Sequence, residues 1–308
     1  MNIQQSLFSK GLVLVFTIAT TGLFAQDAAP EAKPAAEKVK GTFENGVTIN
    51  NQTVATPHKS ALDFNIQHRF GAVKGKSDLY GLFAPSNIRL GLTYGILSNL
   101  SLGFGATKNK RLYDLNWKYT PIIQTTDNSV PVTLSYYGNA AVCALPKANF
   151  YANSDTRGID SSNIFIDRMN FIHELMVAGK INDKISVQLA LSYTHFNLVD
   201  SGFQHDIIGC SFVGRYRFSP QSSVLVEFDN PITKHSGAAK QKPNLGIGWE
   251  VSTGSHQFQM FLCSADAISY NQIMGYNQNQ FDKAFKKKGF KEYNTFVLGF
   301  NITRELGF

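Results

Sequence analysis

Charged residues at alternating positions of several apolar stretches are the side chains of this sequence best placed to do chemistry. The ten candidates are Arg69, Arg89, Asp114, Lys118, Glu174, Arg215, Arg217, Glu227, Asp229 and Glu250. Charges of both signs that leave bulk water must be paired or kept wet. Lining a lumen, they would form a charged constriction that selects solutes or, if paired across strands, a network that fills a closed interior. A narrow or plugged pore is our leading interpretation.

Covalent catalysis and cofactor binding find little support in the sequence. His173 and His195 lie on apolar faces, but Phe196 and Asn197 follow His195, and Ser201 comes only in the next loop. Without an adjacent nucleophile, the histidine has nothing to activate. No histidine pair has metal-ligand spacing, and the glycine-lysine stretch at 71–77 is one residue short of a phosphate-binding loop. We therefore expect no enzyme activity and no cofactor, with a lipid-modifying enzyme as the weakest alternative.

A basic run near the C-terminus is the one conspicuous charge cluster. Lys286, Lys287 and Lys288, flanked by further lysines and phenylalanines, precede the last apolar stretch. Such a cluster in an outside loop could bind the phosphates of lipopolysaccharide or another anion. A solvated loop is the plainer alternative. Nucleic acid is not expected as a partner of an exported chain.

Strands must position these charges, because apolar residues recur with a period of two. In the closing stretch, Phe296, Leu298, Phe300 and Ile302 alternate with polar or small residues, and the chain ends on Phe308. A terminal aromatic residue after an alternating strand is typical of the strand that the outer-membrane barrel assembly machinery recognises.

Twelve such stretches run from residue 62 to the C-terminus. They begin at residues 62, 88 and 100 and continue as 112–119, 130–141, 169–181, 185–198, 207–218, 224–230, 244–253, 256–264 and the closing strand. Connections after even strands are short and those after odd strands long, with exceptions at 107–110 and 121–129. An even number of strands with alternating loop lengths predicts an all-β, antiparallel transmembrane barrel. Fourteen strands are possible if residues 46–55 and part of a long loop also pair.

Export is predicted from the N-terminus. Lys10, an apolar run at 11–24 and Ala25 have the order of a cleaved signal peptide covering residues 1–25. Residues 26–60 begin with an Ala-, Pro-, Glu- and Lys-rich stretch and are expected to form a flexible periplasmic arm, although 41–60 could add a short strand or lie against the barrel mouth. The barrel itself is assigned to residues 61–308. The three cysteines have no disulfide or zinc spacing.

Several stretches together resemble an uncharacterised family of outer-membrane β-barrels typical of Bacteroidetes. They are HRFG at 68–71, FAPSNIRLGLTYGI at 83–96, YDLNWKY at 113–119, YTHFNLV at 193–199 and TGSHQFQ at 253–259. The likeness runs from about residue 45 to the C-terminus. That family has no established reaction or ligand, so the resemblance implies a fold and transfers no site residue.

The sequence thus favours a binding or passage role in the outer membrane of a Gram-negative bacterium. The leading hypothesis is a narrow, charge-lined pore or uptake barrel for small polar solutes. The alternative is a non-conducting structural or accessory barrel that uses its long outside loops to bind other envelope proteins. Outer-membrane lipid, lipopolysaccharide and the barrel assembly machinery are the remaining expected partners.

Overall fold

A computed structural model describes residues 36–72, 79, 81–151, 164–236, 241–279 and 296–307. The predicted signal peptide, the first part of the predicted arm (residues 26–35) and Phe308 lie outside these ranges. Residues 36–308 form one compact unit. Among the described residues, no helix is long and apolar enough to cross a membrane.

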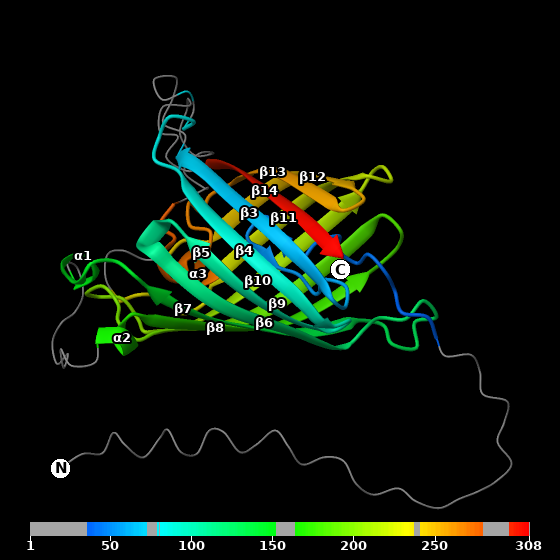
Figure 1. Cartoon of the computed structure of the whole chain (residues 1–308), viewed down its shortest axis with the longest axis horizontal. Coiled ribbons are helices and arrows are strands. Elements are labelled where there is room, and N and C mark those ends of the chain that lie inside the picture. Colours follow the sequence, from blue (N-terminus) through cyan, green and yellow to red (C-terminus); the bar gives the residue numbers. More distant parts are fainter. Residues whose placement is uncertain are drawn as a thin grey trace, which may run out of the picture. The chain divides into compact units, whose positions relative to one another are not determined.

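Twelve antiparallel strands form a closed barrel in chain order, as the alternation predicted (Figure 1). The strands are β3 (Ala61–Ala72), β4 (Asn87–Leu97), β5 (Leu100–Thr107), β6 (Leu112–Ile122), β7 (Thr133–Cys143), β8 (Met169–Lys180), β9 (Ile185–Phe196), β10 (Asp206–Arg217), β11 (Ser222–Pro231), β12 (Asn244–Thr253), β13 (His256–Cys263) and β14 (Val297–Gly307). Each pairs with its sequence neighbours, and β14 closes the barrel by pairing with β3 from Val297↔Ala72 to Gly307↔Ala61. The barrel sheet, as described, therefore has no open edge.

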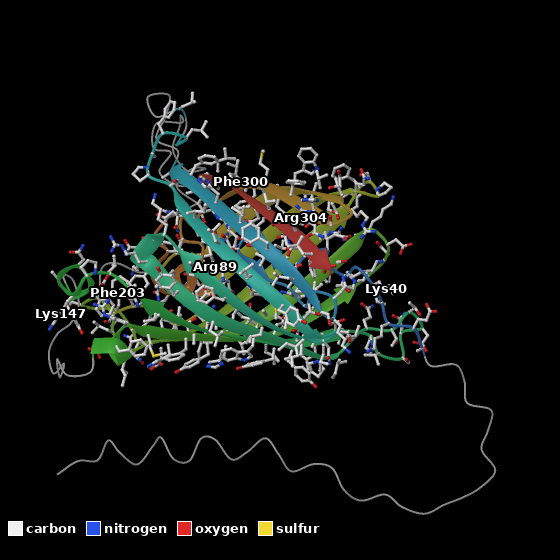
Figure 2. The ribbon with its side chains drawn as sticks, viewed as in Figure 1. Lys40, Arg89, Lys147, Phe203, Phe300 and Arg304 are labelled. Carbon is white, nitrogen blue, oxygen red and sulfur yellow. The ribbon has the colours of Figure 1, made fainter. Side chains whose placement is uncertain are left out.

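Period-two alternation sets which side chains face outward. On β14, Asn301 and Thr303 are buried, whereas Arg304 is exposed. Phe300 and Arg304 both lie on the outer face of that strand (Figure 2). The same alternation leaves many large apolar side chains exposed on other strands, among them Leu90, Leu92, Phe104, Leu115, Leu175, Leu189, Leu191, Ile247, Trp249 and Met260. An apolar outer face and a polar inner one are the reverse of a soluble β-sandwich.

The connections differ in length between the two ends of the barrel. At the end that holds Lys40, four of the five connections are tight turns, and we call it the short-turn end (Figure 2). The long-loop end, marked by Lys147 and Phe203, carries α1 (Lys147–Tyr151), α2 (Ile164–Asp167) and α3 (Tyr270–Tyr276).

The structure contains both of the predicted exceptions to the alternation of loop lengths. The β5–β6 connection at the long-loop end is a short turn containing the 3-10 helix η2 (Asn109–Arg111). The β6–β7 connection at the short-turn end is long because it binds the incoming chain: the amide of Val39 donates to the Gln124 carbonyl at 2.7 Å. Lys38 also forms an isolated antiparallel bridge with Thr125.

The chain before the barrel corrects the expectation of a flexible arm through residue 60. The short strands β1 (Val47–Thr48) and β2 (Asn51–Gln52) pair with each other and not with the barrel, so the barrel has twelve strands and not fourteen. Residues 42, 43, 45, 48–51, 53 and 54 are buried. They lie inside the barrel because their hydrogen-bond partners are inward-facing side chains of its strands. Polar composition alone gives the same signal for a solvated linker and for a segment inside a polar lumen.

Gly95 on β4 lets the entering chain pass close to the wall. A Cβ at Gly95 would lie 2.1 Å from the carbonyl oxygen of His58. We expect Gly95→Ala to lower the free energy of unfolding by about 1–3 kcal/mol, because backbone atoms must shift. Urea unfolding of the refolded protein in lipid vesicles measures this. Gly179→Ala on β8, where a Cβ meets nothing within 4 Å, is the matched control; equal losses would contradict the explanation.

Candidate functional site

A short hairpin fills part of the barrel lumen. We define the lumen hairpin as residues 45–55, which include β1 and β2. Its two arms are joined by the amide of Thr53, which donates to the Gly46 carbonyl at 3.0 Å. Ile49 begins the turn with a positive φ of 53°, a conformation rarely adopted by β-branched residues. The surrounding wall contacts must hold this turn in place.

Two buried carboxylates on β11 bind the tip of the lumen hairpin. Glu227 accepts hydrogen bonds from the backbone amide of Asn50 at 2.9 Å and from both the Asn50 and Asn51 side chains. Asp229 accepts from Asn51 at 2.8 Å. From the other side, Asn244 donates to both carboxylates, at 2.8 and 2.7 Å. Amide donors therefore satisfy this pair of acids.

Arg69 on β3 binds the same turn with a positively charged side chain. Its guanidinium is fully buried and donates to the carbonyl of Ile49 at 2.9 Å and to the side-chain oxygen of Asn50 at 2.8 Å. It also donates to Asn301 at 3.1 Å and lies over the Phe261 ring at 4.3 Å. Asn50 thus lies between a buried cation and a buried anion and bonds to both.

Two glutamines of the wall bind the main chain of the hairpin arms. The Gln259 side chain donates to the Val47 carbonyl and accepts from the Ile49 amide, both at 3.1 Å. On β9, the Gln188 side chain donates to the Gln52 carbonyl at 2.7 Å and accepts from the Val54 amide at 3.0 Å.

Most of the remaining predicted lumen charges are paired in two groups. Arg215 donates to Glu250 at 2.9 Å and to Glu44 of the entering chain at 2.7 Å, and Arg217 donates to Glu44 as well. Arg89 and Asp114 form an ion pair at 2.7 Å.

The last two predicted lumen residues, Lys118 and Glu174, also have no ion pair within 4 Å among the described residues. Lys118 instead donates to the carbonyls of Gly46 and Ala55, both at 3.0 Å. The carboxylate oxygens of Glu174 are buried without a hydrogen-bond partner there.

The ten predicted residues therefore lie inside the barrel. Not all of them form the ion pairs with neighbouring strands that the sequence made possible. Glu227 and Asp229 do not bond to Arg215 or Arg217, because Glu44 and the two asparagines of the hairpin compete for these groups. Sequence reasoning missed these hairpin residues. The polar Asn-Asn-Gln run between Ile49 and Val54 gave no signal for them, because a solvated linker has the same composition.

An apolar cluster that includes part of helix α3 also lies inside the barrel. Helix α3 lies against β8, β9, β10 and β11. Its Ile273 and Met274 pack in a buried cluster with inward side chains such as Ile172, Met176 and Ile207. At the edge of this region, the Lys110 ammonium lies 3.6 Å from the Tyr276 ring centre, and burial lowers the pKa of Lys110.

Cavities remain along one side of the lumen hairpin. The largest, about 500 Å³, opens at the short-turn end and is lined by residues of the entering chain and by Asp63. Cavities of about 40 and 20 Å³ follow deeper in the barrel, and both are lined by Gln52 and Arg89. A fourth, about 140 Å³, lies at the long-loop end beside Lys110 and Arg168. Arg89 and Asp114 both line the smallest of these four cavities.

Within the described part of the chain, the histidine considered for catalysis bonds to a carboxylate and a carboxamide. The ring nitrogens of His195 contact Asp206 at 2.6 Å and Asn197 at 2.9 Å. His173 contacts the Tyr136 hydroxyl at 2.6 Å. No group of three or more metal-binding side chains occurs in the described ranges. The lysine cluster at 286–288 lies outside them.

Several solved structures of outer-membrane proteins match this chain at low sequence identity. The NanC porin is 8% identical, with a TM-score of 0.45, covering 79% of this chain and 97% of its own. The KdgM porin is also 8% identical, with a TM-score of 0.41 and coverage of 80% and 99%. An outer membrane channel from Pseudomonas putida F1 is 13% identical, with a TM-score of 0.45 and coverage of 82% and 97%.

A search of functionally described proteins gives no significant match. The model of one family, described as a membrane bound beta barrel domain (DUF5777), matches residues 43–306. The matched range includes the lumen hairpin as well as the barrel wall. The chain therefore belongs to this family of membrane-bound β-barrels.

Proposed function

We propose that the protein is an outer-membrane passage barrel for small polar solutes whose lumen is closed by the lumen hairpin. The observation that carries the proposal is how the hairpin is held. Side chains of the wall bind it through hydrogen bonds from Arg69, Lys118, Gln188, Gln259 and Glu227. Among the hairpin residues themselves, only Ile49 and Val54 are buried apolar side chains.

Polar attachment supports a reversible plug. A hydrogen bond exchanged for water changes the free energy by only about 0.5–1.5 kcal/mol, provided that neither partner is left dry. Both chain connections of the hairpin lie at the short-turn end, and the cavity of about 500 Å³ beside them is open there. Withdrawal toward that end would let water reach Glu227 and Arg69. The hairpin would remain tethered throughout.

The charges along the remaining path support small polar solutes as cargo. The cavities beside the hairpin are lined by Asp63, Lys118, Arg89 and Asp114. Side chains of both signs favour solutes that hydrogen-bond over apolar ones. The Arg89–Asp114 pair, which lines the smallest of the four cavities, would set the selectivity.

A non-conducting barrel is the second candidate, favoured by the apolar cluster inside the lumen. Helix α3 and the inward side chains of β8 and β10 form a packed cluster that includes Met176 and Met274, both fully buried. Such packing resists hydration. In this case the long loops would bind other envelope proteins and the lumen would serve stability alone.

The location and partners are part of the proposal. A Gram-negative outer membrane, reached through a cleaved signal peptide and the barrel assembly machinery, suits an apolar outer face and a closing β14 strand. The resemblance noted in the sequence suggests a Bacteroidetes source. Lys286, Lys287 and Lys288 remain our proposed contacts with lipopolysaccharide.

Removing the side chain of Asn50 should loosen the hairpin without unfolding the barrel. We expect Asn50→Ala to speed amide hydrogen exchange in residues 45–55 about tenfold or more, since it breaks bonds to both Glu227 and Arg69. Exchange in β3–β14 should stay unchanged. Asn149→Ala, at an exposed position of α1, is the control. Unchanged exchange in 45–55 would show that the turn contacts do not hold the plug.

Opening of the plug should be visible as conductance. In planar bilayers, the mature chain (residues 26–308) should be nearly silent, and Asn50→Ala/Asn51→Ala should open frequently. In that background, Arg89→Gln should shift selectivity toward cations, because Asp114 loses its partner. Asn149→Ala should match the unaltered chain. Silence from a double variant with fast exchange in 45–55 would favour the non-conducting barrel.

A further inference from the structure

The wall recognises the main chain of the lumen hairpin in a repeated pattern. Gln259 binds the carbonyl of residue 47 and the amide of residue 49. Gln188 binds the carbonyl of residue 52 and the amide of residue 54. In both cases, one carboxamide forms hydrogen bonds with the C=O of a residue and with the N–H of the residue two positions later.

This pattern is the one that an extended chain offers to a parallel neighbour. In a parallel ladder, the N–H and C=O of one residue bond to residues two apart on the next strand. The glutamine carboxamide supplies the same donor and acceptor pair. Gln188 lies on β9 and Gln259 lies on β13. Each of them binds a different arm of the hairpin.

Further wall contacts also go to main-chain atoms. Arg69 and Asn301 both donate to the Ile49 carbonyl, at 2.9 and 2.8 Å. Lys118 binds two carbonyls, and the Thr120 hydroxyl donates to the Val54 carbonyl at 3.3 Å. Main-chain contacts of this kind bind peptides with little dependence on sequence.

Side-chain recognition is concentrated at the turn. The acidic pair on β11 binds the carboxamides of Asn50 and Asn51, and Thr303 accepts from Asn45 at 2.6 Å. Two carboxylates at this position favour a carboxamide or a cationic side chain over an anionic one. The lumen thus combines general main-chain binding with one charge-selective position.

We infer that the lumen is a binding site for peptide in a hairpin conformation, which the lumen hairpin occupies in the closed barrel. The ligand class is a peptide with Asn, Gln, Lys or Arg opposite Glu227 and Asp229. Saccharides and simple ions lack the alternating carbonyl and amide groups that Gln188 and Gln259 bind. The inference rests on the proposed function in one respect: the hairpin must be able to leave.

A labelled peptide tests the inference in the full mature chain. The probe is a fluorescent synthetic peptide with the sequence of residues 43–57, and anisotropy reports its binding to protein in lipid nanodiscs. Asn50→Ala/Asn51→Ala and, separately, Thr53→Pro loosen the resident hairpin while leaving every wall side chain in place. Thr53→Pro does so by removing the amide that bonds to Gly46. We expect saturable binding to both variants, at least tenfold tighter than to the unaltered chain.

Three comparisons separate main-chain recognition from non-specific adsorption. A peptide N-methylated at the positions of Ile49 and Val54 should bind at least tenfold more weakly. It lacks the two N–H groups that donate hydrogen bonds to the glutamine side chains. A peptide that keeps the two asparagines but scrambles the flanking residues should bind within about threefold. Gln188→Ala/Gln259→Ala, added to the loosened variants, should weaken binding at least tenfold. Gln67→Ala should not, because Gln67 is a buried wall residue that bonds to Arg89 and not to the hairpin.

The outcomes distinguish this inference from the proposed passage function. No saturable binding to either loosened variant, or equal binding of the N-methylated peptide, would overturn the inference even if the variants conduct. Saturable binding with the expected glutamine dependence in a barrel that never conducts would support the peptide site and refute passage.

Discussion

The buried polar contacts around Asn50 are the interaction on which the interior of this barrel depends. Arg69 and Glu227 are both fully buried and carry opposite charges, and each needs several hydrogen-bond partners away from bulk water. Asn50 bonds to both. The turn of the hairpin is thereby held by polar contacts, and Arg69 and Glu227 are satisfied without pairing with each other.

The interior combines polar contacts with an apolar cluster that also includes Val54 of the hairpin. Around the lumen hairpin, amides and charges leave small polar cavities that water can enter. Around α3, apolar side chains such as Ile273 and Met274 are packed as in the core of a soluble protein. A solute that crosses the barrel must therefore meet a hydrogen-bonded plug and then a packed apolar region. The second barrier favours the non-conducting role.

Hydrogen bonds link the entering chain to the barrel wall. His58 bonds to Glu305 on β14 at 2.7 Å, and the Ser60 amide donates to the Gly95 carbonyl at 2.7 Å. The long β6–β7 connection binds residues 37–39 in the same region. Because these contacts hold both flanks of the hairpin at the short-turn end, movement of the hairpin is confined to that direction.

Local alternation was enough to determine the barrel. The parity of apolar residues predicted which side chains face outward, and strand number followed from counting alternating stretches, as the pairing of β14 with β3 confirms. The inward charges could be listed for the same reason. A period of two is a property of each strand by itself and needs no knowledge of distant residues.

The partners of those charges were decided only by the tertiary structure. Asn50 and Glu227 are 177 residues apart in the sequence, and Glu44 and Arg215 are 171 apart. Nothing in the polar stretch around 45–55 separates a solvated linker from a segment inside a polar lumen, because both lack an apolar face. The choice depends on the unsatisfied donors and acceptors that barrel closure gathers in one place. That arrangement exists only once the strands have closed.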